Sequence, residues 1–569
     1  MELRNFKIVK PVSNVADERK GDLEPLRWTI TPIRNPELDC ERLDLERLEK
    51  RGVIPPVIKI GGRLVVKRQK IAILSEEEIK TIGNNSGSRI GKRPVNVQVV
   101  RVSDCPNPAD EYGRPTFTVL LSFDENAEVV ARNTFTQTNL APITQSNNFL
   151  LSGTLPGSKP SPPIQEDLIS ATVADSDFQS SDRVDRAQYP EDAQAVVAVV
   201  DSGVKFDLAN EPSQHLYAYT DRQNQSVPLQ LVRGRAACGL NTEGIGYCGV
   251  TAYLGVPGSP PATVPPLLNV LTSLSRQQVA SSAFDDHRLR TIYEDSAGKR
   301  SDGIGGRHGT YLTAIINQES GRVAGVLPVK AFNCGGYGTL FDVLSCLNYV
   351  LEQKRQGLPI YVLNASWVGS VDDEGKSLLI SKFKQLEKAG IIVVAAAGNE
   401  GKDLGRNELF PARYSALLSN VITVTSVEPI LKPVLRNTGS KNSTGNGSIH
   451  EDELPLLEYA AIPKSQFGLS VRGFKVVGNF SSTFVSIGVY GRRWSGFNSP
   501  FNDGQSVRGT SFAAAFVSGR IAAYLHDKGI VPTAGTMTQL KSELFATLTI
   551  TENSLRQTVQ EGRLLVVNS

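Results

Sequence analysis

The chain has 569 residues, of which 40% are hydrophobic and 21% charged, as in a soluble globular protein and unlike a disordered one. This length predicts roughly four ordinary domains, or one large enzyme domain with an extension. The 61 Lys and Arg residues nearly balance the 58 Asp and Glu residues, leaving a net charge of +3 that favours no nucleic-acid partner. No apolar run approaches the roughly 20 residues that a membrane span needs, so we expect no membrane segment.

The N-terminal part, residues 1–151, predicts a small folded unit of α+β or mostly β structure. Strand-like runs at 96–102 and 115–123 are separated by polar turns that contain Gly and Pro. Residues 152–192 are rich in Ser, Pro, Asp and Gln and predict a linker or an exposed covering segment. The first residues lack the continuous apolar segment of a secretory signal, so we expect the protein to be cytoplasmic.

From residue 193 onward the pattern predicts an α/β domain with a mostly parallel sheet. Short apolar runs alternate with helical periodicity, which is typical of β-α-β units. The expected strands are 193–200, 326–332, 360–363, 391–397 and 421–427. One expected helix carries an apolar stripe formed by Leu340, Val343, Leu344, Leu347 and Leu351. A second is expected near 377–388, and residues 209–300 read as a surface insertion.

The six cysteines are too few to form a disulfide framework in a chain of this length. Two small loops are open to pairing, one between Cys238 and Cys248 and one between Cys334 and Cys346. Because no secretory signal is seen, we favour free thiols for all six.

Two polar motifs lie at the ends of predicted elements: one follows a strand and the other begins a helix. Asp201 comes directly after the strand 193–200, at the sheet edge where open parallel sheets bind ligands, although Asp-Ser-Gly is also an ordinary turn. His308 lies in a Gly-rich segment at the start of a predicted helix, where a substrate can reach a general base. A surface histidine in a loop is the alternative.

Two further motifs complete the set. Asn399 follows the strand 391–397 and can present an N–H donor to developing negative charge, or simply form a turn. Ser511 begins an Ala-rich helix, where a serine is either a nucleophile or a helix cap. Together Asp201, His308, Asn399 and Ser511 supply the orienter, base, oxyanion donor and nucleophile of acyl transfer.

These residues and their flanks resemble the subtilisin-like serine proteases, or subtilases. The matching segments are AVVAVVDSGV around Asp201, GGRHGT around His308, VVAAAGNEG around Asn399 and VRGTSFAAA around Ser511, with YVLNASWVGS and NFSS between them. The Asp, His, Ser chain order is also that of the family. The resemblance implies a three-layer α/β domain over 193–569, with the insertion excepted.

The resemblance also implies a role for each site residue. Ser511 would be the nucleophile, His308 the base, and Asp201 the residue that orients and stabilises the imidazole. Asn399 would form the oxyanion hole with the backbone N–H of Ser511. A separate set would line the cleft and pair with an extended substrate: Ser366, Trp367, Val368 and Gly369.

The sequence departs from the family at three places. Residues 205–208, a few positions after Asp201, read Lys-Phe-Asp-Leu where the family has an acidic residue followed by His-Pro. The proline that usually follows the catalytic serine is missing, which predicts weaker activity. Val368 stands where Gly is common, and we expect it to narrow the neighbouring subsites toward small or slender side chains.

The implied activity is that of a serine endopeptidase acting on proteins or peptides, with no cofactor needed for its chemistry. A structural calcium ion is common in the family, but we assign no ligand to it. The alternative is a catalytically weak pseudoprotease that binds peptides or serves assembly. For residues 1–192 two hypotheses stay open: a removable propeptide, cleaved within 152–192, and a permanent domain that binds a partner protein.

Overall fold

The structure is a computed structural model, and it describes slightly more than half of the chain. The described residues are 55–84, 89–90, 93–94, 96–103, 105–107, 113–123, 134–135, 143–152, 195–204, 206–207, 215–216, 218–220, 226–228, 288–294, 300–306, 308–321, 323–332, 337–433, 469–490, 496–498 and 506–566. The predicted linker and most of the predicted insertion lie outside these residues.

A nine-stranded sheet forms the centre of the larger part of the molecule. Its strands follow the order β16-β9-β18-β19-β20-β22-β26-β25, and β21 pairs with β20. The pairs from β16 to β26 are parallel, whereas β25 and β21 pair antiparallel. The bounds are β9 Ala195–Asp201, β16 Ala324–Lys330, β18 Ile360–Ala365, β19 Ile392–Ala396, β20 Val421–Pro433, β21 Leu469–Val476, β22 Ile487–Tyr490, β25 Ile550–Thr551 and β26 Arg563–Val566.

The central strands are mostly apolar because helices cover both faces of the sheet. Every residue of β9, β16 and β19 is buried. All five strands predicted from the sequence are present, with ends shifted by a few residues. The predicted mostly parallel α/β sheet is therefore confirmed.

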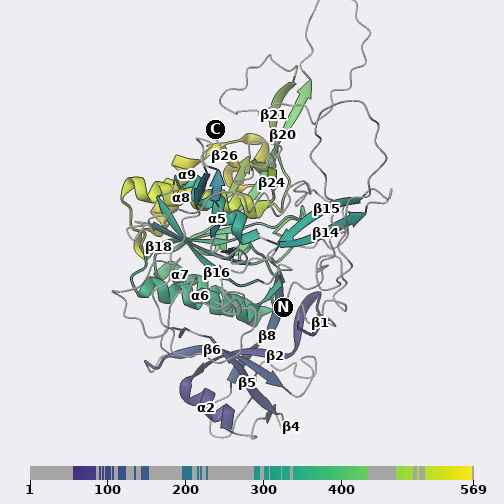
Figure 1. The fold of residues 1–569 in the computed structure, drawn as a ribbon, viewed down its shortest axis with the longest axis vertical. Helices are drawn as coiled ribbons and strands as arrows, with labels where there is room; N and C mark the ends of the chain where they lie inside the picture. The colour runs from purple at the N-terminus through teal and green to yellow at the C-terminus, as the bar shows by residue number, and fades with distance from the viewer. Residues whose placement is uncertain are drawn as a thin grey trace, which may run out of the picture.

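Helices form a layer on each side of the sheet (Figure 1). Helices α5 His308–Glu319 and α8 Thr510–Lys528 pack against each other on one face, and α6 Leu340–Arg355 and α7 Asp373–Lys388 cover the other. The helix α6 carries the predicted apolar stripe and begins at a capping box between Thr339 and Asp342. The three-layer arrangement is therefore confirmed. The helix α9 spans Met537–Leu548, and the 3₁₀ helices are η3 Ala412–Ala416, η6 Ala534–Thr536, η7 Asn553–Leu555 and η8 Gln560–Gly562.

A second, antiparallel sheet belongs mainly to the N-terminal part. It follows the order β17-β8-β2-β6-β5, with β1 paired to β2 and β7 to β8. The bounds are β1 Val57–Ile60, β2 Arg63–Ser75, β5 Val97–Val102, β6 Thr116–Phe123, β7 Thr134–Phe135, β8 Ile143–Ser152 and β17 Tyr337–Thr339, together with helix α2 Glu76–Asn84. The strand β17 comes from the segment before α6, so this sheet joins two distant parts of the chain. Assignment of 1–151 and 193–569 as separate domains stays a prediction.

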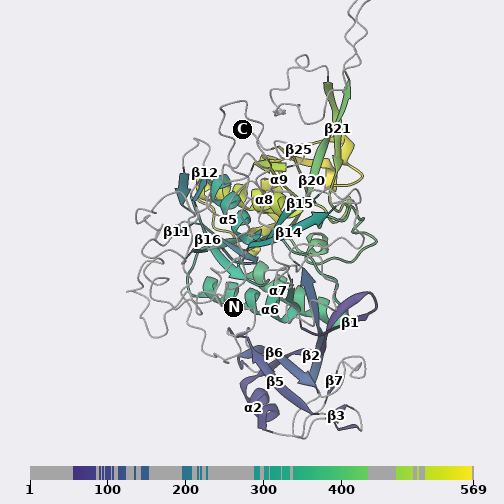
Figure 2. The ribbon, with the colours of Figure 1, turned by 45° about the vertical axis from the view of Figure 1, so that its right-hand side comes forward.

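The N-terminal sheet is sandwiched between helices of both parts. Because successive strand residues point to opposite faces, Leu120 packs into the large core beside α6 while its neighbours Val119 and Leu121 pack in a small core with Ile82 of α2. Figures 1 and 2 both show the sheet below α6 and α7, which separate it from the large sheet. The N-terminal unit therefore has an α+β structure that docks on these two helices.

The remaining described strands form short two-stranded ribbons. They are β3 Arg89–Ile90 with β4 Arg93–Pro94, β10 Phe206–Asp207 with β11 His215–Leu216, β12 Ala218–Thr220 with β13 Ser226–Pro228, β14 Arg288–Glu294 with β15 Arg300–Gly306, and β23 Gly496–Asn498 with β24 Ser506–Arg508. Within the described residues, no helix is long and apolar enough to cross a membrane.

Two of the six cysteines lie in the described part of the chain. Cys346 is a buried free thiol, as favoured above, so the alternative loop between it and Cys334 is not formed. Cys105 is disulfide-bonded, which corrects the expectation of free thiols throughout. Cys238 and Cys248, the other two residues left open to pairing, lie outside the described residues, as do Cys40 and Cys334.

Candidate active site

The candidate site is at one edge of the large sheet. Asp201 is the last residue of β9, Ser366 follows β18, and Asn399 lies three residues beyond β19. These three strands are adjacent and parallel, so their carboxyl ends meet at the same edge. The sheet order thereby brings together residues that are far apart in the sequence.

Asp201 and His308 form a buried hydrogen-bonded pair. His308 is the first residue of α5, and its Nδ1 lies 2.8 Å from Asp201 Oδ1. The side chains are only 2% and 10% exposed, respectively. A carboxylate at Nδ1 accepts a hydrogen bond and so keeps the proton on that nitrogen, which leaves Nε2 as the basic atom.

Ser202 and Lys330 fix the turn that carries Asp201. The backbone N–H of Ser202 donates to Asp201 Oδ1 over 2.8 Å, and its hydroxyl accepts the backbone N–H of Gly309 over 3.0 Å. Lys330 Nζ donates to the Ser202 carbonyl over 2.8 Å. One serine therefore ties the end of β9 to the first turn of α5.

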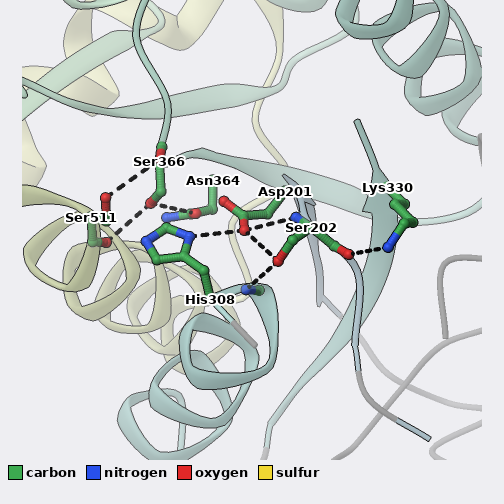
Figure 3. A network of polar contacts seen from close by, with 8 residues as sticks. Asp201, Ser202, His308, Lys330, Asn364, Ser366 and Ser511 are labelled. Carbon is green, nitrogen blue, oxygen red and sulfur yellow. Dashed lines mark hydrogen bonds and ion pairs between the residues drawn. The ribbon is translucent and has the colours of Figure 1, made fainter. Parts of the chain in front are cut away.

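Ser511 lies on the other side of the imidazole. Figure 3 shows the His308 ring between Asp201 and Ser511, with its second nitrogen on the side of the serine. Ser511 Oγ is 3.4 Å from the Ser366 carbonyl oxygen, and the Ser366 hydroxyl lies 3.0 Å from the Ser511 carbonyl oxygen. The Phe512 ring packs against the imidazole with ring centroids 5.5 Å apart. Helix α8 begins at Thr510 without the proline that the family usually has after the serine.

Thr510 orients the side-chain amide of Asn399. Asn399 Oδ1 accepts hydrogen bonds from the backbone N–H and the hydroxyl of Thr510, each over 2.9 Å. The Thr510 hydroxyl in turn accepts the backbone N–H of Gly398 over 3.1 Å. Because the amide oxygen is held by both Thr510 donors, the two amide hydrogens are turned away from Thr510.

The residues of the predicted cleft segment lie in two environments: Trp367 and Val368 are buried, and Gly369 contacts the N-terminal unit. Trp367 is 1% exposed and packs near Phe332 in the core, with ring centroids 6.3 Å apart. Val368 is also buried. Gly369 lies against the N-terminal unit, because a Cβ atom added there would meet Leu151 Cδ2 at 2.3 Å.

A strand of the N-terminal unit runs along this edge. Residues Leu150, Leu151 and Ser152 of β8 pair antiparallel with β17. Side chains of β8 also reach the predicted cleft segment and the residues after it: Leu151 contacts Gly369, and Asn147 Nδ2 donates to Asp372 Oδ2 over 2.8 Å. As the residue number rises from 147 to 151 on one segment, it falls from 372 to 369 on the other, so β8 runs antiparallel to the cleft segment.

Sequence reasoning missed several residues of this arrangement. Leu151 and Lys330 touch or support the site, but nothing in the sequence pattern connects them with it. Thr510 stands beside Ser511 in the matched segment VRGTSFAAA, but no role was assigned to it. Asn479 lies in the NFSS motif that was noted without a role. Among the described residues, no group of His, Cys, Asp and Glu has a metal-binding arrangement.

The model of the subtilase family, peptidase S8, matches residues 192–560. The chain belongs to the subtilase family, whose members are serine-type peptidases.

Individual relatives are distant. Subtilisin-like protease 3 of Plasmodium falciparum (isolate 3D7) is 28% identical over 148 residues, which cover 22% of this chain and 18% of the relative. The major intracellular serine protease of Bacillus subtilis (strain 168) is 32% identical over 146 residues, 24% of this chain and 43% of the relative. The chain therefore matches less than half the length of these curated relatives. A crystal structure of a cold adapted subtilisin-like serine proteinase aligns with a TM-score of 0.32 and 16% identity over 66% of this chain and 89% of that chain.

Proposed function

We propose that the protein is a serine endopeptidase that hydrolyses peptide bonds through an acyl-enzyme on Ser511. The observation that carries this proposal is the buried contact between His308 Nδ1 and Asp201 Oδ1, with the imidazole lying between Asp201 and Ser511 (Figure 3). A base placed between a carboxylate and a hydroxyl is the arrangement that activates a serine.

In the first step Ser511 Oγ attacks the carbonyl carbon of the scissile bond, and His308 Nε2 takes the hydroxyl proton. Asp201 stays ionised and stabilises the imidazolium that forms. The carbonyl oxygen becomes an oxyanion, which accepts hydrogen bonds from the Asn399 amide and the Ser511 backbone N–H.

The proton on His308 then passes to the leaving amine, and the bond between carbon and nitrogen breaks. A water molecule then adds to the ester carbon of the acyl-enzyme while His308 takes one of its protons. His308 returns that proton to Ser511 Oγ as the bond between the acyl carbon and Oγ breaks, which releases the acid and restores the serine. The proton count closes after both halves, and no cofactor enters any step.

We further propose that residues 55–152 form an internal inhibitor whose last strand occupies the substrate groove. This proposal is supported by the pairing of β8 with β17 and by the contact of the Leu151 side chain with Gly369. Main-chain pairing with an added strand is a common mode of peptide recognition, and side-chain pockets then supply specificity. This favours the propeptide hypothesis over a permanent partner-binding domain.

The contacts of the unit with α6 and α7 include many buried polar groups. Asn348 of α6 donates to Thr118 Oγ1 over 3.1 Å, and Asn148 Oδ1 accepts the backbone N–H of Phe341 over 3.1 Å. Asn147 donates to Asp372, the cap of α7, over 2.8 Å and accepts a hydrogen bond from Lys70 within the unit; burial lowers the pKa of Lys70 to about 8. Polar interfaces of this kind are typical of units that separate.

The test is peptide hydrolysis by the purified chain and by Ser511→Ala, followed by mass spectrometry of the products. Ser345→Ala is the matched control, because Ser345 is also a buried serine but lies on α6. We expect cleavage products from the wild type and the control and none from Ser511→Ala. A folded wild type that yields no products after removal of the N-terminal unit would instead support a pseudoprotease.

A further inference from the structure

Besides Thr510, one more buried side chain from a distant part of the chain holds the loop that carries Asn399. This loop, residues 397–402, follows β19 and reverses direction at Gly398 and Gly401, whose φ angles are +95° and +64°. Asn399 lies between these glycines and is partly exposed. Without outside contacts, a loop of this kind would not fix a side chain to the accuracy that an oxyanion donor needs.

Asn479 supplies those contacts with its whole amide group. Its Nδ2 donates to the carbonyl oxygen of Ala397 over 2.9 Å and to Glu400 Oε2 over 2.7 Å. Its Oδ1 accepts the backbone N–H of Lys402 over 2.8 Å. The side chain is fully buried, and its donors and acceptor tie the start, middle and end of the loop together.

The backbone around Asn479 adds further bonds to the same loop. The Asn479 N–H donates to the Gly398 carbonyl over 2.7 Å, and the Phe480 N–H donates to the Lys402 carbonyl over 3.0 Å. The Asn479 carbonyl accepts the hydroxyl of Thr425, which anchors it to β20. The segment therefore connects the Asn399 loop to the rigid sheet.

We propose that Asn479 is a positioning residue for oxyanion stabilisation, acting through Asn399. This inference rests on the proposed peptidase function. Thr510 sets the rotation of the Asn399 amide, whereas Asn479 sets the position of the backbone from which that amide extends. Loss of the Asn479 donors moves the amide away from the oxyanion and lowers kcat, but leaves the substrate-pairing edges at β17 and Gly369 in place.

The informative substitution is Asn479→Asp, which keeps the size of the side chain. It replaces the two amide hydrogens with an oxygen that faces the Ala397 carbonyl and the Glu400 carboxylate, so two attractive contacts become repulsive. Removing an oxyanion donor outright costs about 10²–10³ in kcat, and displacing it should cost less. We expect kcat for a short peptide to fall about tenfold and KM to change by less than about twofold.

A double-mutant cycle separates positioning from general damage. Asn479→Asp is made in the wild type and in the Asn399→Ala background, with kcat per active site counted by fluorophosphonate titration. If Asn479 acts through Asn399, Asn479→Asp should cause no further loss of kcat in the Asn399→Ala background. Equal losses in both backgrounds, or an unchanged kcat in the wild type, would overturn the proposal.

The matched control is Asn420→Asp. Asn420 is equally buried and donates to the Ile391 carbonyl over 3.0 Å, but it lies at the opposite end of β19 from Asn399. It should lower the melting temperature while leaving kcat per active site unchanged. Failure of the proposed peptidase function would give a different result: Ser511 of the wild type would form no fluorophosphonate adduct, so no active sites would be counted.

Discussion

Lys382 of α7 is a buried amine at the contact between the α6–α7 layer and the N-terminal unit. Its Nζ donates to Asn107 Oδ1 of that unit and to Gln385 Oε1, the latter over 3.3 Å. The residue is 3% exposed, and burial lowers its pKa from 10.5 to about 7. An amine that prefers the neutral form when docked makes the stability of the docked chain depend on pH.

The sign follows from the two pKa values. Between pH 7 and 10.5 the unfolded chain keeps the Lys382 proton while the folded chain has lost it, so the free energy of unfolding rises with pH across this window. Each pH unit contributes at most about 1.4 kcal/mol, and from pH 7 to pH 9 the rise from this one group is about 2 kcal/mol. Below pH 7 the contribution is constant.

The assay compares urea unfolding of the wild type and of Lys382→Met at pH 7 and pH 9. Methionine is similar in length but does not titrate, so the difference in stability between the two proteins should shift by about 2 kcal/mol in favour of the wild type at pH 9. Lys384→Met, at a nearby exposed lysine, is the control, and its unfolding free energy should follow that of the wild type between pH 7 and pH 9. Equal pH dependence in the wild type and Lys382→Met would refute the reasoning.

Three further predictions concern the site. Thr510→Val removes the hydroxyl that donates to Asn399 and should lower kcat about tenfold, whereas Thr510→Ser should retain wild-type activity; steady-state kinetics in which Val and Ser behave alike would refute this role. Asp201→Asn presents a donor to His308 and favours the wrong tautomer, so kcat should fall about 10⁴-fold at neutral pH; a loss below tenfold would argue against the pair. Self-processing should cut within a residue or two of the Thr154–Leu155 bond. This expectation continues the antiparallel direction of the contacts at Asn147 and Leu151 by about three residues, which would bring the chain to the level of Ser366, because a strand rises about 3.3 Å per residue. N-terminal sequencing that finds the cut beyond residue 160 would contradict that register.

The layered fold could be predicted from the sequence because its signals are local. Buried parallel strands such as β9 are continuous apolar runs, and the stripe on α6 has a helical period. The strand β17 could not be predicted in the same way. Its three residues, Tyr337 to Thr339, gain their pairing only from β8, nearly two hundred residues earlier in the chain.

The residues of the candidate site also fall into those with local sequence signals and those that depend on long-range contacts. Asp201, His308, Asn399 and Ser511 stand in recognisable segments, and sheet topology then brings them to one edge. Trp367 was expected to line the cleft, but its backbone position turns the ring into the core. Asn479 and Leu151 act through contacts between distant segments, which leave no periodic pattern in the sequence.

The most direct test of the account is intact-mass spectrometry of the wild type and Ser511→Ala after incubation with a fluorophosphonate. The account predicts one adduct on the wild type, none on Ser511→Ala, and loss of the N-terminal unit from the wild type alone. A folded wild type that carries no adduct, even after limited proteolysis of residues 152–192, would contradict the claim that Asp201, His308 and Ser511 form a working peptidase.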